Sequence, residues 1–284
     1  MTAFSPFDGQ AVSRFAPSPT GLLHLGHAYS AVLARGAASR FLLRIEDIDG
    51  GRCRPEFVTA IFDDLHWLGV DWDGPPVIQS EQAAAHDAAL AKLRDMGLVY
   101  RCICTRADIA AAAGAPQGEQ PPLYPGTCRG RSFDFAQPFA WRLDMAQAIA
   151  RVGPLHWHDT LVGDIRATPE IFGDVVAARK DAGTSYHLAA TVDDAAMGIT
   201  KIVRGQDLLT ATHVHRLLQA LLDLPTPIYH HHRLILGADG KRLAKRTSGA
   251  TLADLRASGV DGRALAADLR AGGLPHGFSF DPKP

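Results

Sequence analysis

The stretch Arg14–Ala31, with the sequence RFAPSPTGLLHLGHAYSA, constrains the fold more than any other part of this chain. It begins at the end of Val12–Phe15, a short and largely apolar run that can form a buried strand. Pro17 and Pro19 must end that strand, because proline fixes φ and has no N–H to donate to a sheet. The chain therefore turns directly after the strand.

We expect a helix after this turn, capped by Thr20 or Gly21. Apolar residues follow at nearly helical spacing, namely Leu22, Leu25, Ala28, Tyr29 and Val32. Its first turn would expose unpaired N–H groups and the positive end of the helix dipole, where His24 and His27 add imidazole donors. This arrangement favours a phosphate ligand. The stretch is neither a lysine-containing P-loop nor GxGxxG, so both of those nucleotide sites are excluded.

Composition limits the class of protein. The chain has 284 residues, 46% of them hydrophobic, which is enough for one large core or two modest ones. Its apolar runs are too short to span a bilayer and its first 20 residues do not resemble a signal peptide, so we expect a cytoplasmic protein that does not contact membranes. A net charge of −1 gives no overall positive field, so any RNA surface must be a local patch.

A parallel α/β fold is predicted from the order of the elements. Arg40–Ile45 is typical of a buried strand, and it follows the first strand and helix. Ligands bind beyond the carboxyl ends of such strands, which is where Glu46 lies. Residues 54–68 and 81–96 have apolar positions at helical spacing, and we interpret both as scaffold.

The cysteines indicate a metal site. Four cysteines are too few for a disulfide framework in a chain of this length. Cys102 and Cys104 alternate as in a strand, so their thiols would share one face, and a loop rich in Gly, Pro and Ala brings back Cys128. A structural zinc needs a fourth ligand, for which His156 or His158 is one possibility. Residues 129–183 resemble short strands of an α+β insertion.

Further strands are predicted in the second half of the chain. The apolar middle of residues 186–194 suits a central strand, and residues 199–204 continue this character. The guanidinium of Arg204 could hold a carboxylate with two hydrogen bonds, or it could pair with Asp207. Residues 210–222 form an amphipathic pattern and residues 225–236 a last strand. The three histidines at 230–232 do not favour a metal site, because consecutive strand residues alternate faces.

The end of the chain has a cation-rich loop, Gly237–Arg246, which could hold a charged leaving group. One or two helices are expected in Thr251–Ala271. Pro275–Pro284 has the composition of a frayed tail.

Two of these segments resemble the signatures of one enzyme family. His24-Leu25-Gly26-His27, preceded by FAPSPTG, resembles the ATP-binding signature of class I aminoacyl-tRNA synthetases in the form used by the glutamate-activating branch. Gly237–Arg246 resembles the second signature, with Lys245 at the position of the lysine that contacts ATP. Arg242, Ala244 and Arg246 replace the usual first lysine and two serines, so no roles are assigned to the serine positions.

The resemblance implies a set of site residues. It places in the glutamate site Arg14, Phe15, Ala16, Pro17, Ser18, Glu46, Tyr186 and Arg204, with Glu46 near the ammonium group and Arg204 or Arg14 at the γ-carboxylate. It places at ATP His24, Gly26, His27 and Lys245, of which His24, His27 and Lys245 would be catalytic. A C-x-C…Y-x3-C pattern implies zinc ligands at Cys102, Cys104, Tyr124 and Cys128.

Fewer than forty residues follow Arg246, too few for the anticodon-binding domain of a glutamyl-tRNA synthetase. This, together with the cysteine pattern, resembles the family of glutamyl-queuosine tRNA(Asp) synthetases. That family implies ATP-dependent and tRNA-independent activation of glutamate, its transfer to the queuosine base of tRNA(Asp), Mg²⁺ with the ATP, one structural zinc and a monomer. The alternatives are a glutamyl-tRNA synthetase core charging a tRNA 3′ end, a small-molecule adenylyltransferase or ligase, and a non-catalytic RNA-binding module.

The fold expected from this resemblance is a Rossmann-like parallel sheet with an inserted zinc-binding α+β subdomain. Its two halves would occupy residues 1–98 and 184–249, the insertion residues 99–183 and a C-terminal helical segment residues 250–284.

Overall fold

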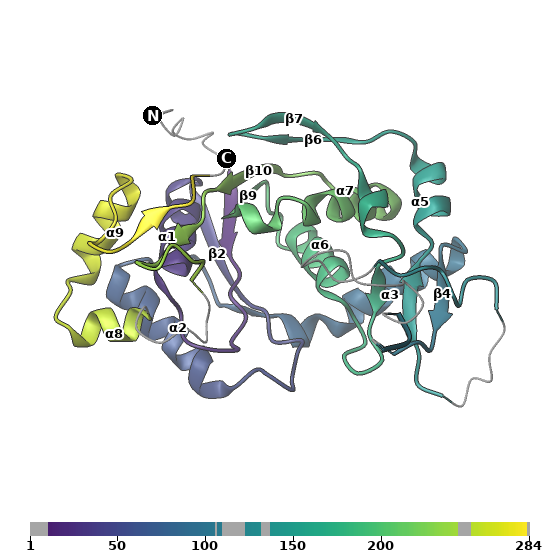
Figure 1. The fold of residues 1–284 in the computed structure, drawn as a ribbon, viewed down its shortest axis with the longest axis horizontal. Helices are drawn as coiled ribbons and strands as arrows, with labels where there is room; N and C mark the ends of the chain where they lie inside the picture. Colours follow the sequence, from purple (N-terminus) through teal and green to yellow (C-terminus); the bar gives the residue numbers. More distant parts are fainter. Residues whose placement is uncertain (1–10, 106, 110–122, 132–136, 244–250, 283–284) are drawn as a thin grey trace.

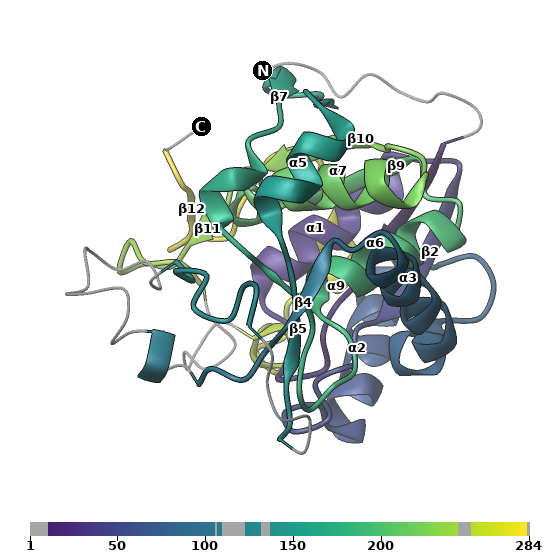
Figure 2. The same cartoon turned by 90° about the vertical axis from the view of Figure 1, so that its right-hand side faces the viewer.

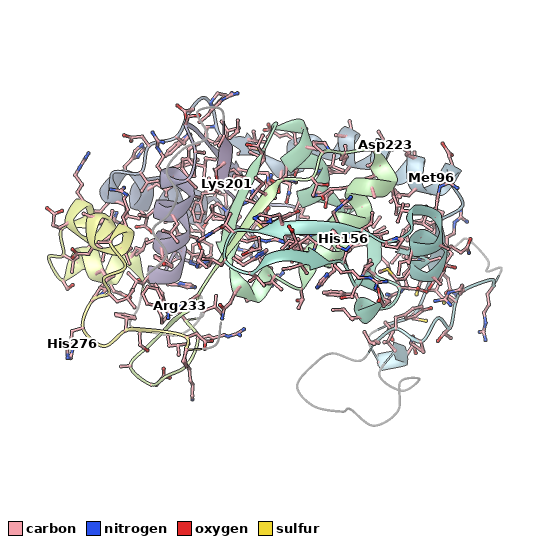
Figure 3. The ribbon with its side chains drawn as sticks, turned by 90° about the horizontal axis from the view of Figure 1, so that it is seen from above. Met96, His156, Lys201, Asp223, Arg233 and His276 are labelled. Carbon is pink, nitrogen blue, oxygen red and sulfur yellow. The ribbon has the colours of Figure 1, made fainter. Side chains whose placement is uncertain are left out.

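A computed structural model describes residues 11–105, 107–109, 123–131, 137–243 and 251–282 of the chain. The molecule is longer in one direction than in the others (Figure 1). Figure 3 shows Met96 and His276 toward opposite ends of this long axis, with Lys201 and His156 between them. None of the described helices has the length and apolar character needed to cross a membrane.

A largely parallel sheet lies at the centre. Its first part contains three parallel strands in the order β1 (Val12–Phe15), β2 (Arg40–Ile45) and β3 (Val77–Ile78). Its second part has the order β7 (Gly163–Arg166), β6 (His156–Asp159), β10 (Ile228–His232) and β9 (Lys201–Gly205), in which only the β6–β7 pair is antiparallel. The two parts meet where the amide of Thr200 donates to the carbonyl of Val12 at 3.0 Å. The carboxyl ends of β1, β2 and β9 therefore lie close together.

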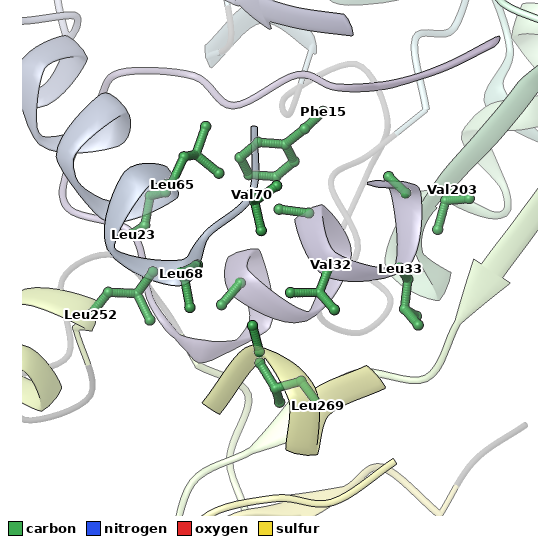
Figure 4. Packing of buried hydrophobic residues seen from close by; sticks show 14 of the residues in the cluster. Phe15, Leu23, Val32, Leu33, Leu65, Leu68, Val70, Val203, Leu252 and Leu269 are labelled. Carbon is green, nitrogen blue, oxygen red and sulfur yellow. The ribbon is translucent and has the colours of Figure 1, made fainter. Parts of the chain in front are cut away.

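The largest apolar core surrounds the first helix, α1 (Leu25–Gly36). Figure 4 shows Val32 and Leu33 of this helix among Leu65, Leu68 and Val203, with Leu252 and Leu269 from the end of the chain close by. Three further helices contribute to this core, namely α2 (Pro55–Leu68), α8 (Leu252–Ala257) and α9 (Gly262–Arg270). The C-terminal helices therefore pack in the same core as α1 and α2 (Figure 1).

A second apolar core is formed by helices that do not contribute to the first. It joins the helices α3 (Ala83–Asp95), α5 (Met145–Val152), α6 (Tyr186–Ala196) and α7 (Ala211–Leu222). An antiparallel sheet of β4 (Val99–Cys102), β5 (Ala140–Leu143) and β8 (Val176–Ala178) packs against these helices (Figure 2). Short 3-10 helices at Gln79–Gln82, Pro169–Phe172 and Gln206–Leu208 complete the connections.

The structure confirms most of the predicted elements. The strands at Val12–Phe15 and Arg40–Ile45, the helix ended by Gly97, and the helix before Asp223 are all present. Residues 225–236 form two short strands, β10 and β11 (Ile235–Leu236), rather than one.

One predicted strand is a helix. Residues 186–196 form α6, whose cap is the Ser185 hydroxyl, which accepts a hydrogen bond from the amide of Leu188. The prediction was wrong because residues 188–194 are all buried, including Thr191, Asp193 and Asp194, so no solvent-exposed polar face marks the helical period.

Two ends of elements also differ from expectation. The helix predicted to be capped by Thr20 or Gly21 begins only at Leu25, and His24 is its cap. Pro275–Pro284 was expected to be frayed, but β12 (Ser279–Phe280) pairs with β11. The Phe280 ring lies 5.2 Å from that of Tyr29, so burial of this aromatic side chain holds the segment in place.

Candidate active site

A cleft of about 480 Å³ opens where β1 and β9 end and α1 begins. Its walls include every residue predicted for the glutamate site and the histidines predicted for ATP, namely Arg14, Phe15, Ala16, Pro17, Ser18, His24, Gly26, His27, Glu46, Tyr186 and Arg204. Lys245 lies outside the described residues.

Two backbone contacts bring the first loops of the sheet together. The amide of Glu46 donates to the carbonyl of Pro17 at 3.0 Å, and that of Arg54 donates to Pro19 at the same distance. The loop that follows β1 is therefore joined to the loop that follows β2. This places Glu46 beside the signature stretch, as expected for the ends of adjacent parallel strands.

The histidines at the start of α1 hold each other in place. His24 Nδ1 accepts from the amide of Gly26 at 3.1 Å, and His27 Nδ1 accepts from the amide of His24 at 3.1 Å. Because both Nδ1 atoms accept, each neutral ring carries its hydrogen on Nε2. A Cβ at position 26 would lie 3.0 Å from the His24 ring, so a larger residue would require that ring to shift. Both rings and the positive end of the helix therefore lie at the cleft wall.

The described residues on either side of 244–250 lie at the same end of the cleft. Arg242 and Leu243 line it. Thr251 forms a bridge with His24, and the amide of Leu252 donates to the carbonyl of Leu23 at 2.8 Å. The described residues that flank the second predicted signature therefore lie next to the first signature.

One side of the cleft contains paired charges, and we call it the carboxylate corner (Arg14, Arg44, Glu46, Asp193 and Asp194). Asp194 Oδ1 lies 2.9 Å from Arg14 Nε and 2.6 Å from Arg44 Nη1. Arg44 also reaches Glu46 Oε1 at 2.9 Å. Burial alone would raise the pKa of Asp194, but the two arginines outweigh it and hold that pKa at about 2. The charge of Arg14 is therefore already compensated within the protein.

A second group of buried polar side chains adjoins the cleft at Arg204 and contains imidazoles; we call it the histidine corner (Arg204, His187, His215 and His231). Arg204 Nε donates to His231 Nε2 at 3.0 Å, and Arg204 Nη1 is 3.4 Å from His215 Nδ1. His215 Nε2 in turn lies 3.2 Å from His187 Nδ1. Because a guanidinium can only donate, the ring nitrogens that face it must be unprotonated acceptors.

The histidines of this corner are neutral. Burial, together with the charge of Arg204, lowers the pKa of His187 to about 4 and takes that of His215 well below its usual range. Among the described residues no carboxylate lies within 4 Å of Arg204, and the ion pair with Asp207 that the sequence left open is not formed. Arg204 is thus a cation buried among neutral partners, with a cleft beside it.

Reasoning from the sequence missed several of these residues. Arg44 and Asp194 were placed in strands without a role, and His231 was one of three histidines given none. An arginine in the middle of the buried run RFLLRI was the one signal present, because a buried cation requires a partner.

The predicted zinc residues form a separate cluster. The sulfur atoms of Cys102, Cys104 and Cys128 all lie within 4.8 Å of one another. The hydroxyl of Tyr124 is 3.5 Å from Cys102 Sγ and accepts from the amide of Cys128 at 2.7 Å. The alternative ligand His158 bonds instead to Asp164 on the β6–β7 hairpin. The cluster adjoins β4, away from α1 along the long axis (Figure 1).

This cluster fits a zinc ion. Tetrahedral zinc with Zn–S bonds of about 2.3 Å separates its sulfurs by about 3.8 Å, which is compatible with the observed spacing. Burial and the neighbouring thiols raise the pKa of Cys104 to about 11, so a thiolate there requires a cation. Because the cluster is remote from the cleft, a zinc ion there would have a structural role.

A family model described as tRNA synthetases class I (E and Q), catalytic domain, matches residues 10–276. The glutamyl-Q tRNA(Asp) synthetase of Rhodobacter capsulatus is 48% identical over 91% of this chain and 98% of its own length. That of Symbiobacterium thermophilum is 43% identical over 87% of this chain and 81% of its own. The glutamate–tRNA ligase of a Synechococcus species is 39% identical over 89% of this chain and 56% of its own.

The fold is also similar to that of solved structures. The crystal structure of a glutamate tRNA ligase from Elizabethkingia meningosepticum, in complex with its amino acid, aligns with a TM-score of 0.68 at 28% identity. The alignment covers 84% of this chain and 52% of that chain.

Proposed function

This chain belongs to the class I tRNA synthetase family for glutamate and glutamine, and from this premise we propose that it attaches glutamate to the queuosine base of tRNA(Asp). Three of its similar relatives, at 43% to 48% identity, are named glutamyl-Q tRNA(Asp) synthetase. The observation that carries the proposal is one cleft with a phosphate-binding helix start at one end and a buried arginine without a carboxylate partner among the described residues.

The first step joins glutamate to ATP. A glutamate α-carboxylate oxygen attacks the α-phosphorus, the bond from that phosphorus to the bridging oxygen breaks, and pyrophosphate leaves. No side-chain nucleophile is needed, so the protein's task is to position the reactants and to stabilise negative charge. The Nε2–H groups of His24 and His27 and the helix start serve this at the phosphates, together with Lys245. Mg²⁺ accompanies the nucleotide.

Glutamate is held by both corners. The Arg204 guanidinium binds the γ-carboxylate, assisted by the Tyr186 hydroxyl, which lies 3.4 Å from Arg204 Nη1. The carboxylate of Glu46 binds the ammonium group. Arg14 shapes the pocket wall with Phe15, Ala16, Pro17 and Ser18, because its charge is matched by Asp194.

The second step transfers the glutamyl group. A hydroxyl of the queuosine base attacks the carbonyl carbon of the adenylate, the hydroxyl loses its proton, and AMP leaves. The structural zinc at Cys102, Cys104, Tyr124 and Cys128 maintains the β4 region and does not enter either step.

Two assays test this proposal. Exchange of pyrophosphate into ATP should require glutamate, with glutamine and aspartate inactive, and should proceed without tRNA. Labelled glutamate should then become attached to tRNA(Asp) that carries queuosine, and alkali should release it from the ester. Attachment only to queuosine-free tRNA(Glu) would favour charging of a 3′ end, the activity named for the Synechococcus relative.

A further inference from the structure

Behind Arg204 lies a buried pair that does not line the cleft and that no step above uses. Asp159 ends β6 in the region predicted as an insertion, and His231 lies on the neighbouring strand β10. We infer that Asp159 and His231 are positioning residues, which fix the orientation of Arg204 for the γ-carboxylate of glutamate.

The hydrogen bonds from Arg204 through His231 to Asp159 fix which atom donates and which accepts at each step. Arg204 Nε donates to His231 Nε2 at 3.0 Å, so that ring nitrogen accepts and the ring hydrogen must be on Nδ1. His231 Nδ1 lies 2.8 Å from Asp159 Oδ2, which accepts this hydrogen. Both side chains are completely buried, so water cannot substitute for either partner.

Asp159 is itself held by backbone. Its Oδ1 accepts from the amides of Leu161 and Val162 at 2.8 and 3.1 Å, and its Oδ2 accepts from the amide of His231 at 3.0 Å. Burial would raise the pKa of Asp159, but these hydrogen bonds and that from the His231 ring lower it overall. An ionised carboxylate therefore opposes the charge of Arg204 across a neutral imidazole.

The other contacts of Arg204 leave one nitrogen for a ligand. Nη2 donates to the Thr212 hydroxyl at 2.6 Å and to the Leu208 carbonyl at 3.2 Å. Among the described residues, Nη1 makes only long contacts, at 3.4 Å, to Tyr186 and His215. With Nε fixed by His231 and Nη2 by Thr212 and Leu208, the plane of the guanidinium is determined, and Nη1 is the nitrogen that can donate to the carboxylate of a ligand.

The neighbouring histidines on β10 provide a matched comparison. His230 Nδ1 bonds to the Thr160 hydroxyl at 2.6 Å, and His232 Nε2 bonds to the Ser30 hydroxyl at 2.7 Å. His230 is buried to a similar degree as His231 and, like it, does not line the cleft, but its side chain bonds to Thr160, whereas that of His231 bonds to Arg204. A change at His230 therefore perturbs the same strand without touching Arg204.

The inference rests on the proposed function, and glutamate-dependent pyrophosphate exchange tests it with His231→Leu, His231→Gln and His230→Leu. We expect His231→Leu to raise the KM for glutamate about tenfold and to leave the KM for ATP nearly unchanged, because Arg204 Nε then has no acceptor. Gln carries an oxygen able to accept, so His231→Gln should restore part of the loss. His230→Leu should lower the melting temperature comparably without changing the KM for glutamate.

Asp159→Asn tests the direction of the hydrogen bonds. An amide facing His231 Nδ1 would move the ring hydrogen to Nε2, where it would oppose the Arg204 N–H. We expect a raised KM for glutamate in a protein that remains folded by circular dichroism. Equal increases in the KM values for glutamate and ATP, or an unchanged glutamate KM in folded variants, would overturn the inference.

A spectroscopic measurement separates this inference from the proposed function. In ¹⁵N-histidine spectra of the wild-type protein at neutral pH, His231 should carry its hydrogen on Nδ1, and Asp159→Asn should reverse this. A wild-type hydrogen on Nε2 overturns the positioning role whatever the substrate. Exchange that does not respond to glutamate, with the Nδ1 form present, overturns the proposed function alone.

Discussion

The two corners of the cleft bury the same kind of side chain in opposite ways. Arg14 and Arg204 are each about 5% exposed. Arg14 faces Asp194, a carboxylate, whereas Arg204 faces imidazoles, a hydroxyl and a carbonyl. Burial alone therefore does not identify a ligand-binding arginine. The difference lies in whether the protein supplies the opposite charge or leaves it to be supplied by a substrate.

The largest expected effect is on stability at the carboxylate corner. Asp194→Asn leaves Arg14 and Arg44 without their shared counter-charge and should lower the free energy of unfolding by about 3–5 kcal/mol. Urea denaturation followed by fluorescence measures this. Asp181→Asn removes the carboxylate of a surface pair with Arg179 and serves as the control, with an effect below about 1 kcal/mol. Equal effects of the two variants would contradict the assigned role of Asp194.

The histidine corner should respond in activity instead. Arg204→Ala removes the contact to the γ-carboxylate, which should weaken glutamate binding by about 2–5 kcal/mol because the contact is desolvated. Steady-state exchange at varied glutamate measures this as a raised KM or lost activity. Arg204→Lys retains the charge without the planar fork and should recover little. A glutamate KM equal to that of the wild type would remove Arg204 from the pocket.

The corners should also lose stability in different pH ranges. The pKa of His187 is about 4 in the folded protein and 6.5 in the unfolded chain, so on acidification the unfolded chain takes up the proton before the folded protein does. The free energy of unfolding should therefore fall by about 3 kcal/mol as the pH drops from 6.5 to 4. Asp194, with a pKa of about 2, contributes about 2 kcal/mol, which is lost as pH falls from 3.8 to 2. Urea titrations across pH should show that His187→Gln flattens only the upper range. A change confined to the lower range would refute this assignment.

The smallest expected effect is that of the cysteine cluster on the cleft. Metal analysis should find about one zinc per chain. Cys102→Ser should lose it, because a structural zinc needs four ligands and the cluster has only three thiolates to supply. The glutamate KM of that variant should change by less than about twofold, since the two sites are well separated. Cys53→Ser, outside the cluster, should retain the zinc. A native protein without zinc, or a large change in KM, would contradict a purely structural site.

The sequence was most informative where a local pattern determines structure. The prolines after β1, the largely apolar run RFLLRI and the glycine after α3 each act within a few residues, and these elements were predicted correctly. Most residues that line the cleft could be predicted, because many of them belong to one contiguous stretch of sequence. Residues 186–196 were assigned wrongly because residues 188–194 are buried whether apolar or charged, so this part of α6 has no exposed face to reveal its period.

The contacts between distant residues could not be predicted in this way. Asp194 meets Arg14 and Arg44 only after α6 packs across the sheet, with sequence separations of 180 and 150 residues. The capping role of His24 likewise depends on the actual start of α1. The residue type at one position does not reveal its distant partner when the helix or strand that carries it has not been assigned correctly.

The strand pairing of the β6–β7 hairpin has a consequence for protein engineering. Because β6 pairs with β10 and ends at Asp159, residues 99–183, which were predicted to form an insertion, are not a self-contained module. A chimera that exchanges this segment between relatives must take Asp159 and His231 from the same parent. Hybrids that mix the two parents here should fold and yet discriminate poorly among amino acids.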